Sequence, residues 1–429
     1  MAYAHEPAKR PDQRAVSDAK APVREVRLKA LLFALLALRL CYPFFNSPLA
    51  HLFSDPQRHW DNAARFLDPS IMGANDPFLY QAWLYALRTL SCGAAPAVIF
   101  GCGLLCAAMP YGWYRALREC RPRRFALIGA LLIGLIPESL SVYGYFMNET
   151  LLLTLLGFCI WQTLRARRKR TAGAFALACV LWSCAALTRT LVVPMAACCV
   201  LWLWTMLPQK LGKAIIGIGI AGAFVACACG HAQGKLHFFA PFGNLYFNEI
   251  YSVSGRREIA VDYGPDGFYH FGGPSFYNPT FYPFSTWTTA RNGVASIRID
   301  LSRGRTDWIS EKARIAAQSD FPPVRAWLEN LTYLLFGQIW PNSTPHTPMG
   351  WLTLWSRWLW PVLIGVILAA AVMRRYRGDE WLLPAAALGT LALLMFQSQG
   401  VMEARFREPI DPMLLAAVLL IRPPRQAVA

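Results

Sequence analysis

Charged residues are scarce in this chain. They make up 16% of its 429 residues, whereas 55% are hydrophobic and the mean hydropathy is +0.31. A soluble domain of this length does not need so much apolar surface, but a chain that crosses a bilayer several times does. The shortage of charge therefore favours a polytopic membrane protein, and apolar runs long enough to cross a bilayer recur along the sequence.

Cysteine is missing from the large polar segment 231–350, although the chain holds 12 cysteines, most of them inside apolar runs. This distribution argues against a disulfide framework. The sequence also lacks a P-loop and, in the large loop, a D-x-D motif. Its isolated histidines (His59, His270 and His346) lack the spacing of metal ligands and are interpreted as structural. We therefore predict no metal site, no cofactor and no nucleotide ligand.

Acidic residues are fewer than basic ones, 25 against 42, which gives a net charge of +17. The excess does not point to nucleic acid, because the basic clusters lie in short turns between apolar runs or near the end of the chain. This is where the positive-inside rule places lysine and arginine. The clusters are Arg115–Arg124, Arg165–Arg170, Lys210–Lys213, Arg374–Arg377 and Arg422–Arg425.

The apolar runs predict an all-α polytopic protein with ten spans. Placing the N-terminus inside puts every basic cluster on the cytoplasmic side of an inner (plasma) membrane, with the first span as an uncleaved signal anchor. We divide the chain into a cytoplasmic tail 1–27, a membrane module 28–230 with a first outer loop 46–91, a periplasmic loop 231–350, C-terminal spans 351–421 and a cytoplasmic tail 422–429. The predicted spans are 28–45, 92–111, 125–145, 148–165, 172–188, 190–207, 212–230, 351–373, 381–398 and 408–421.

Both outer segments contain patterns of secondary structure. Apolar residues at three- and four-residue intervals predict two amphipathic surface helices in the first loop, over 55–67 and 77–90. The second loop is mixed, with helices expected over 306–319 and 322–340. Its aromatic run 268–287 has two interpretations, an interfacial aromatic belt or a wall that faces carbohydrate.

Ionisable residues at span ends are costly unless they line a site. On the predicted topology, Glu149, Arg189, Arg405 and Arg407 emerge at the outer face, together with Asp55 of the first loop. Arginine suits phosphate through bidentate hydrogen bonds, and a fixed carboxylate suits a general base. These five residues therefore predict a polar pocket on the outer face.

Other polar residues allow more than one interpretation. Asp55 precedes Pro56 and is also a candidate helix N-cap. Arg58, His59 and Asp61 share its segment and are expected at the pocket rim with Glu149. Two carboxyls, Asp55 and Asp61, are candidates for the base, and we favour Asp55. Glu138 and Asp411 lie within spans and are either functional or structural hydrogen-bonding groups.

Three segments carry a resemblance to a known family. They are "SDPQRHWDNAARFL" (54–67), the stretch 134–194 with its Glu after a short outer turn and its later "LTR" before proline, and "EARFREPIDPMLLAAVLL" (403–420). In this order they resemble the GT-C superfamily of polyprenyl-phosphate-sugar-dependent glycosyltransferases, in particular its bacterial protein-mannosyltransferase-like and aminoarabinose-transferase-like members. The chain departs from many relatives in having Pro56 after Asp55 and "LTRT" in place of Arg-Pro.

The resemblance implies a GT-C-type fold and a function. A sugar would move from a polyprenyl-phosphate donor of the undecaprenyl type to a hydroxyl of a glycan, lipid or protein acceptor, on the periplasmic face and with inversion. Asp55 would be the general base, and Arg189, Arg405 and Arg407 would bind the donor phosphate. Glu149 would orient an arginine or a sugar hydroxyl at the pocket rim, and a groove between spans would hold the lipid chain.

Two other functions are compatible with many spans and outer arginines. An O-antigen polymerase or ligase shares the large outer loop, but the "LTR" and "ARFREP" segments fit it less well. A lipid-carrier flippase or transporter would favour repeated halves and charges near the midplane. No such halves are evident, and the ionisable groups gather at one face.

Overall fold

The structure is a computed structural model of the whole chain. It describes residues 12–69, 73–74, 76–206, 210–236, 258–262, 268–271, 294–298, 305–317, 323–337, 348–396 and 404–423. The aromatic run beyond residue 271 lies outside the described residues, as does His346.

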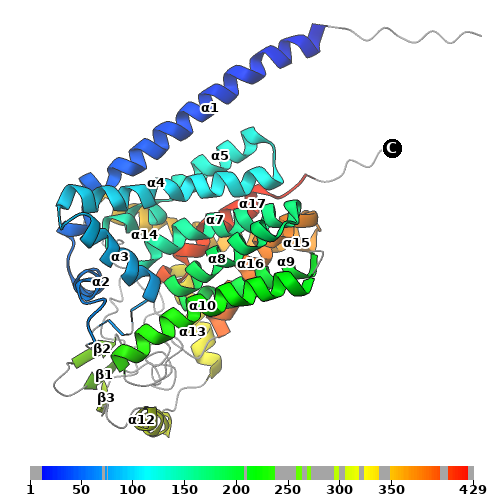
Figure 1. Cartoon of the computed structure of the whole chain (residues 1–429). Helices are drawn as coiled ribbons and strands as arrows, with labels where there is room; N and C mark the ends of the chain where they lie inside the picture. The colour runs from blue at the N-terminus through cyan, green and yellow to red at the C-terminus, as the bar shows by residue number, and fades with distance from the viewer. Residues whose placement is uncertain are drawn as a thin grey trace, which may run out of the picture.

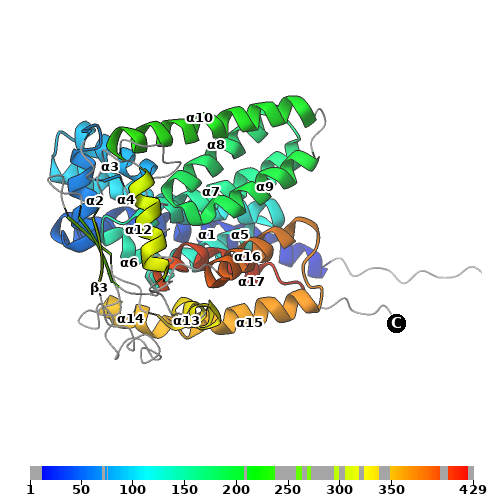
Figure 2. The ribbon, with the colours of Figure 1, turned by 90° about the horizontal axis from the view of Figure 1, so that it is seen from below.

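Most described residues are helical, and the long helices form a bundle (Figure 1). The start of α1 and the end of α17 lie at one end of the bundle, whereas α2, α3 and the strands lie at the opposite end (Figures 1 and 2). The bundle helices are α1 (Asp12–Phe45), α4 (Ala95–Cys120), α5 (Arg123–Gly134), α6 (Pro137–Ser141), α7 (Asn148–Lys169), α8 (Ala172–Thr188), α9 (Val193–Met206), α10 (Lys210–Leu236), α15 (Leu359–Val372), α16 (Leu382–Phe396) and α17 (Asp411–Leu419).

Several of these helices could span a membrane. Among the described residues, four are long and apolar enough: Glu25–Ala50, Ala95–Cys120, Lys210–Leu236 and Gly378–Phe396. The bent pair α5–α6 is a fifth candidate. Every one of the ten predicted spans is nevertheless occupied by a helix or helix pair. The lower count arises partly because several apolar helices are short: α9 and α15 have 14 residues each, and α17 has 9.

The two segments predicted to be outer loops contain helices where they were expected and an additional sheet. The two first-loop helices are α2 (Ser54–Ala64) and α3 (Phe78–Leu90). The second loop contains α12 (Arg305–Ala317) and α13 (Pro323–Phe336), and α14 (Pro348–Ser356) begins at its end and continues into the predicted span 351–373. Three strands, β1 (Glu258–Asp262), β2 (Phe268–Phe271) and β3 (Val294–Arg298), form a sheet in the order β2-β1-β3. Strand β1 is antiparallel to β2 and parallel to β3.

The polar N-terminal segment is partly helical. We expected a tail up to residue 27, but α1 already begins at Asp12. The segment from Asp12 contains neither glycine nor an early helix-breaking pattern, and Pro22 is its one proline before residue 28. Helix formers such as Ala, Gln, Glu, Lys and Arg extend the apolar span backwards. The helix therefore begins within the predicted tail 1–27, and the boundary between this tail and the membrane module stays a prediction.

The core forms where α4 packs against α7. Gly157 of α7 faces the backbone of Gly112 and Trp113 of α4, and the absence of two side chains lets the helices approach closely. Trp113 and Trp182 of α8 are fully buried beside this contact and fill the space around it. Close packing at this point fixes α7, whose first turn carries Glu149, relative to the rest of the bundle.

We expect Gly157→Ala to lower the free energy of unfolding by about 1–3 kcal/mol, because overpacking a tight contact forces the backbone to move. The new Cβ would lie 3.0 Å from backbone atoms of Gly112 and Trp113, which cannot rotate away. Gly219→Ala in α10 is the matched control, since nothing lies within 4 Å of its Cβ position. Thermal unfolding in detergent measures both. Equal stability of the two variants would contradict the tight α4–α7 contact.

A buried arginine stabilises an interruption of the bundle. The axes of Arg123–Gly134 and Pro137–Gly144 differ by 69°. Arg39 of α1, 1% exposed, donates to the carbonyl oxygens of Gly134 (2.7 Å) and Ser139 (3.0 Å) on either side of the break. Its Nε donates to the carbonyl of Cys106 (2.7 Å). Pro110, four residues further on in α4, has no N–H to offer that carbonyl. Arg39 thus supplies donors to carbonyls that the helices leave without one.

Candidate functional site

The first-loop helix α2 presents the predicted base. It begins at Ser54 after Phe53, which is the N-cap and has no side-chain capping bond. The N-cap interpretation of Asp55 is therefore wrong: Asp55 lies in the first turn, directly before Pro56. A carboxylate there is favoured by the positive end of the helix dipole. Its side chain is 30% exposed, so that it is accessible from outside the bundle.

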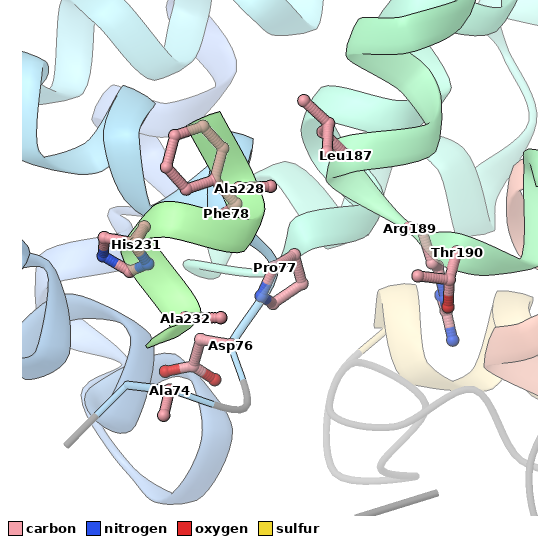
Figure 3. Close-up of a pocket in the computed structure, with 10 residues that line it drawn as sticks. All are labelled: Ala74, Asp76, Pro77, Phe78, Leu187, Arg189, Thr190, Ala228, His231 and Ala232. Atoms are coloured by element: carbon pink, nitrogen blue, oxygen red, sulfur yellow. The ribbon is translucent and has the colours of Figure 1, made fainter. Parts of the chain in front are cut away.

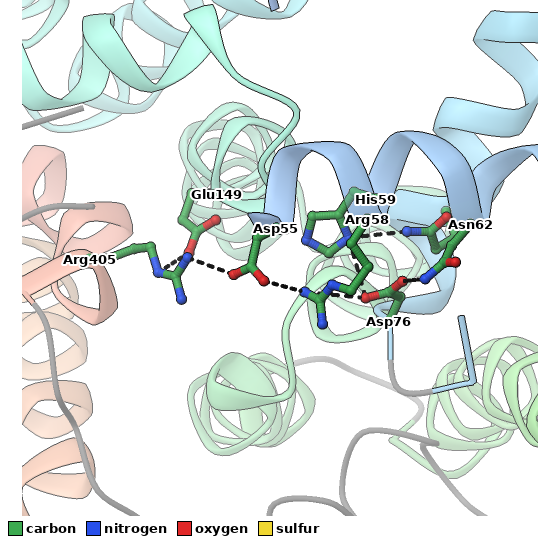
Figure 4. A network of polar contacts seen from close by, with 8 residues as sticks. Asp55, Arg58, His59, Asn62, Asp76, Glu149 and Arg405 are labelled. Atoms are coloured by element: carbon green, nitrogen blue, oxygen red, sulfur yellow. Dashed lines mark hydrogen bonds and ion pairs between the residues drawn. The ribbon is translucent and has the colours of Figure 1, made fainter. Parts of the chain in front are cut away.

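Asp55 belongs to a network that joins four separate segments (Figure 4). One of its oxygens lies 3.0 Å from Nη2 of Arg58, and the other accepts from Nη1 of Arg405 at 3.1 Å. Nε of Arg405 lies 3.6 Å from Glu149 of α7. Arg189, at the end of α8, donates to the same carboxylate oxygen. Two carboxylates therefore alternate with three guanidinium groups that come from distant parts of the sequence.

Burial increases along this network. The side chain of Arg405 is 14% exposed and that of Glu149 is 1% exposed, compared with 30% for Asp55. Arg189 also lies over the ring of Phe406, 4.7 Å from its centroid. Charged groups in such surroundings interact more strongly than in water. Asp55 is thus the accessible carboxylate of the network, and Glu149 is a buried anchor that holds Arg189 and Arg405 in place.

A third carboxylate, Asp76, extends the network on the other side of Arg58 (Figure 4). Its Oδ1 lies 3.5 Å from Arg58 and 3.3 Å from Nδ1 of His59, and its Oδ2 accepts from Asn62 at 2.7 Å. Nε2 of Gln81 lies 3.1 Å from Nδ1 of His59. These contacts fasten α2 to α3 and fix Arg58 between Asp55 and Asp76. Sequence reasoning missed Asp76, for which the one signal was a carboxylate directly before the second predicted loop helix.

The charges of the network set the protonation of its first-loop members. Burial by itself raises the pKa of the Asp55 carboxyl, but Arg58 and Arg405 outweigh it and hold this pKa below its ordinary value. Burial lowers the pKa of the His59 imidazole and, together with Arg58, outweighs the neighbouring Asp76 carboxylate, which raises it. Asp55 is therefore an ionised acceptor at neutral pH, whereas His59 is neutral.

Arg407 lies apart from the network. Its side chain has no exposure, and its Nε lies 2.7 Å from Asp411. It donates to the backbone carbonyls of Leu334 and Leu335, and it lies over the ring of Trp360. The two arginines of "ARFR" therefore have different partners. Arg405 binds Asp55, whereas Arg407 connects α17 to α13 through Asp411 and the carbonyls of Leu334 and Leu335.

The other sequence candidates are also accounted for. Asp61 lies on an exposed part of α2 and makes no ion pair with a described residue. Glu138 is buried and accepts from Ser356 and from Trp360 (3.1 Å), which is a structural hydrogen-bonding arrangement. Glu408 is buried, and neither of its oxygens has a hydrogen-bond partner among the described residues. Glu138 and Glu408 are therefore buried polar residues that lie outside the Asp55 network.

A small cavity adjoins the network (Figure 3). It measures about 20 Å³ and lies between the start of α3, the end of α8 and α10. Asp76 and His231 lie on one side of it and Arg189 on the other. This space holds about one water molecule and is much smaller than the ligand pockets of enzymes. Asp76 and Arg189, which belong to different parts of the network, therefore both line this space.

The arrangement combines a proton acceptor with cations that suit an oxyanion. An ionised Asp55 can accept a proton from a hydroxyl group, and guanidinium groups beside it can stabilise a developing phosphate charge. No group of three histidine, cysteine, aspartate or glutamate side chains suited to a metal ion occurs in the described ranges. Comparison with protein-family models and with curated proteins finds no match to this chain.

Proposed function

We propose that this chain is an integral-membrane glycosyltransferase of the GT-C type. It would take a sugar from a polyprenyl-phosphate donor and transfer it, with inversion, to a hydroxyl of a cell-envelope glycan, lipid or protein on the outer face of the membrane. The proposal includes the ten-span topology with both termini cytoplasmic. The observation that carries it is Asp55, an accessible carboxylate held between the guanidinium groups of Arg58 and Arg405.

The reaction needs one proton transfer and one displacement. Asp55 takes the proton of the acceptor hydroxyl while the oxygen of that hydroxyl forms a bond to the anomeric carbon of the donor. The bond between that carbon and the phosphate oxygen breaks, and polyprenyl phosphate leaves with the electron pair. Arg405 and Arg189 are suited to stabilise the added negative charge. Because Arg407 is bound inside the helices, the proposal leaves it out of the donor site.

The surrounding residues support these roles. Glu149 holds Arg189 and Arg405 on one carboxylate, so that both cations are oriented before substrate binds. Asp76 and Asn62 hold the Arg58 side of the network. The network lies at the same end of the bundle as α2 and α3, opposite the basic turns (Figures 1 and 4). That separation supports an outer site under the positive-inside rule.

Two measurements test the function. Mass analysis of the envelope glycans and glycolipids of a deletion strain is expected to show the loss of one sugar, which identifies the donor. The purified full chain in liposomes, given the corresponding undecaprenyl-phosphate sugar and acceptor material from the deletion strain, should release undecaprenyl phosphate as the acceptor gains mass. Unchanged glycans would reject the proposal. Movement of the carrier across the bilayer without transfer would assign the chain to the flippases instead.

We expect Arg58→Gln to move the acid limb of the kcat/KM profile to higher pH. Asp55 must be ionised to accept a proton, so that the enzyme loses activity as the pH falls through the pKa of the Asp55 carboxyl. Arg58 holds that pKa low, so that removing the guanidinium raises the pKa toward its ordinary value. Arg65→Gln, at an exposed position just after α2, is the matched control and should leave the limb in place. An unchanged limb in Arg58→Gln would contradict Asp55 as the base.

A further inference from the structure

A second cavity lies at the end of the bundle opposite the Asp55 network. It measures about 350 Å³, which is within the range of small-molecule sites. It forms between the end of α15 and the residues that follow α17, two segments that meet at the same end of the molecule (Figures 1 and 2). Its lining residues are Met373, Arg374, Arg375, Arg377, Arg422 and Pro423. Four of the six carry a guanidinium group.

One wall of this cavity is fixed by a buried carboxylate. Glu380, 2% exposed, accepts from Nε (3.0 Å) and Nη2 (2.6 Å) of Arg422. Arg121, at the end of α4, also lies 3.3 Å from Glu380. In addition, the backbone N–H of Arg422 donates to the carbonyl of Arg375 at 3.2 Å. Arg422 is therefore held in position, and the two segments that form the cavity are joined to each other.

The other three arginines of the lining differ from Arg422 in lacking an ion pair with a described carboxylate. The guanidinium groups of Arg374, Arg375 and Arg377 form no ion pair with a carboxylate of the described residues, and Arg374 and Arg377 are exposed. The backbone of Arg374 also has a positive φ of 52°, which residues other than glycine rarely adopt. Like charges this close to one another repel, and an anion among them removes the repulsion. The cavity is therefore suited to a ligand with a concentrated negative charge.

Apolar residues beside the cavity indicate where that anion comes from. Val372, at the end of α15, is 83% exposed, and Met373 of the lining is 56% exposed. Side chains of this kind belong against acyl chains, and phosphate groups lie at the adjoining level of a bilayer. Arginine binds phosphate with two parallel hydrogen bonds. We propose that this cavity binds the phosphate headgroup of an anionic membrane phospholipid.

Titration of the purified full chain with phosphatidylglycerol in neutral detergent tests the site, with binding followed by native mass spectrometry. The wild type should retain phosphatidylglycerol in preference to phosphatidylcholine. Arg374→Gln combined with Arg375→Gln should weaken phosphatidylglycerol binding roughly 30-fold, from the contribution of each arginine to anionic lipid attraction. The pair Arg124→Gln and Lys169→Gln removes the same charge from exposed positions at the same end of the bundle, and should change the affinity less than threefold.

The outcomes of this titration either support or overturn the proposed headgroup site. Equal retention of phosphatidylglycerol and phosphatidylcholine by the wild type would overturn the proposal without reference to any variant. Equal weakening by both double variants would show general charge attraction and would also overturn it. Inorganic phosphate is the second probe: if it displaces the lipid at equal concentration, the cavity binds free phosphate rather than a headgroup. A monodisperse elution profile confirms that the variants are folded.

Discussion

Asp55→Asn is expected to lower the rate of sugar transfer by about 10²–10⁴-fold, the usual contribution of a general base. Asparagine keeps the shape of the side chain and can still accept one hydrogen bond from Arg58 or Arg405. It cannot take the proton of the acceptor hydroxyl. The measurement is release of undecaprenyl phosphate by the reconstituted variant, at donor and acceptor concentrations that saturate the wild type.

The control for this prediction is Asp61→Asn on the same helix. Asp61 is exposed and lies outside the network, so we expect near wild-type transfer. Loss of transfer in Asp61→Asn with retention in Asp55→Asn would move the role of base to Asp61. Retained transfer in both variants, with correct membrane insertion, would remove the general base from the first loop.

Arg407→Gln is expected to lower the free energy of unfolding by about 3–5 kcal/mol, the cost of breaking a buried ion pair by removing one partner. Asp411 would remain as an uncompensated charge without exposure to solvent, and the carbonyls of Leu334 and Leu335 would lose their donor. Thermal unfolding in detergent and the yield of folded protein measure the effect. A variant as stable as the wild type would show that the buried pair contributes nothing to the fold.

Arg405→Gln, two residues away, should behave differently. Glu149 keeps Arg189 and Asp55 keeps Arg58, so that we expect a loss of only about 1–2 kcal/mol of stability. Transfer should fall by about 10²–10³-fold, because one cation that stabilises the leaving phosphate is lost. If the effects were reversed, with Arg405→Gln unfolded and Arg407→Gln stable but inactive, the two arginines would exchange roles.

Much of the helical framework is predictable because apolar length and basic turns are local properties of the sequence. Helices occupy every predicted span, and the periodicity of the first loop locates α2 and α3 to within a few residues. The three-stranded sheet was not predicted. Its strands are four or five residues long and lie among glycine, proline and aromatic residues, which obscures any alternation.

The site is predictable only in part, because its contacts join residues far apart in the chain. Charge at the ends of apolar runs identified Glu149, Arg189 and Arg405, and the charged first loop identified Asp55. The structure brings these four residues together. Arg407 followed the same rule, yet its side chain is fully buried and contacts Asp411 instead of the network. Asp76 lies in a loop and not at the end of an apolar run, and the sequence around it does not indicate which residues it contacts. The difference between Arg405 and Arg407 depends on which way each side chain points, which spacing alone does not determine.

Arg39 has a consequence for the order in which the chain enters the membrane. It lies near the middle of Glu25–Ala50, where a lone arginine adds about 2.5–3.5 kcal/mol to the cost of insertion. The three carbonyls that bind it are translated 67, 95 and 100 residues later. Until those residues emerge from the ribosome, α1 carries an unsatisfied charge. We therefore expect the first helix and the helices α4, α5 and α6 to insert into a membrane as one unit, which becomes stable only when Ser139 of α6 has been made.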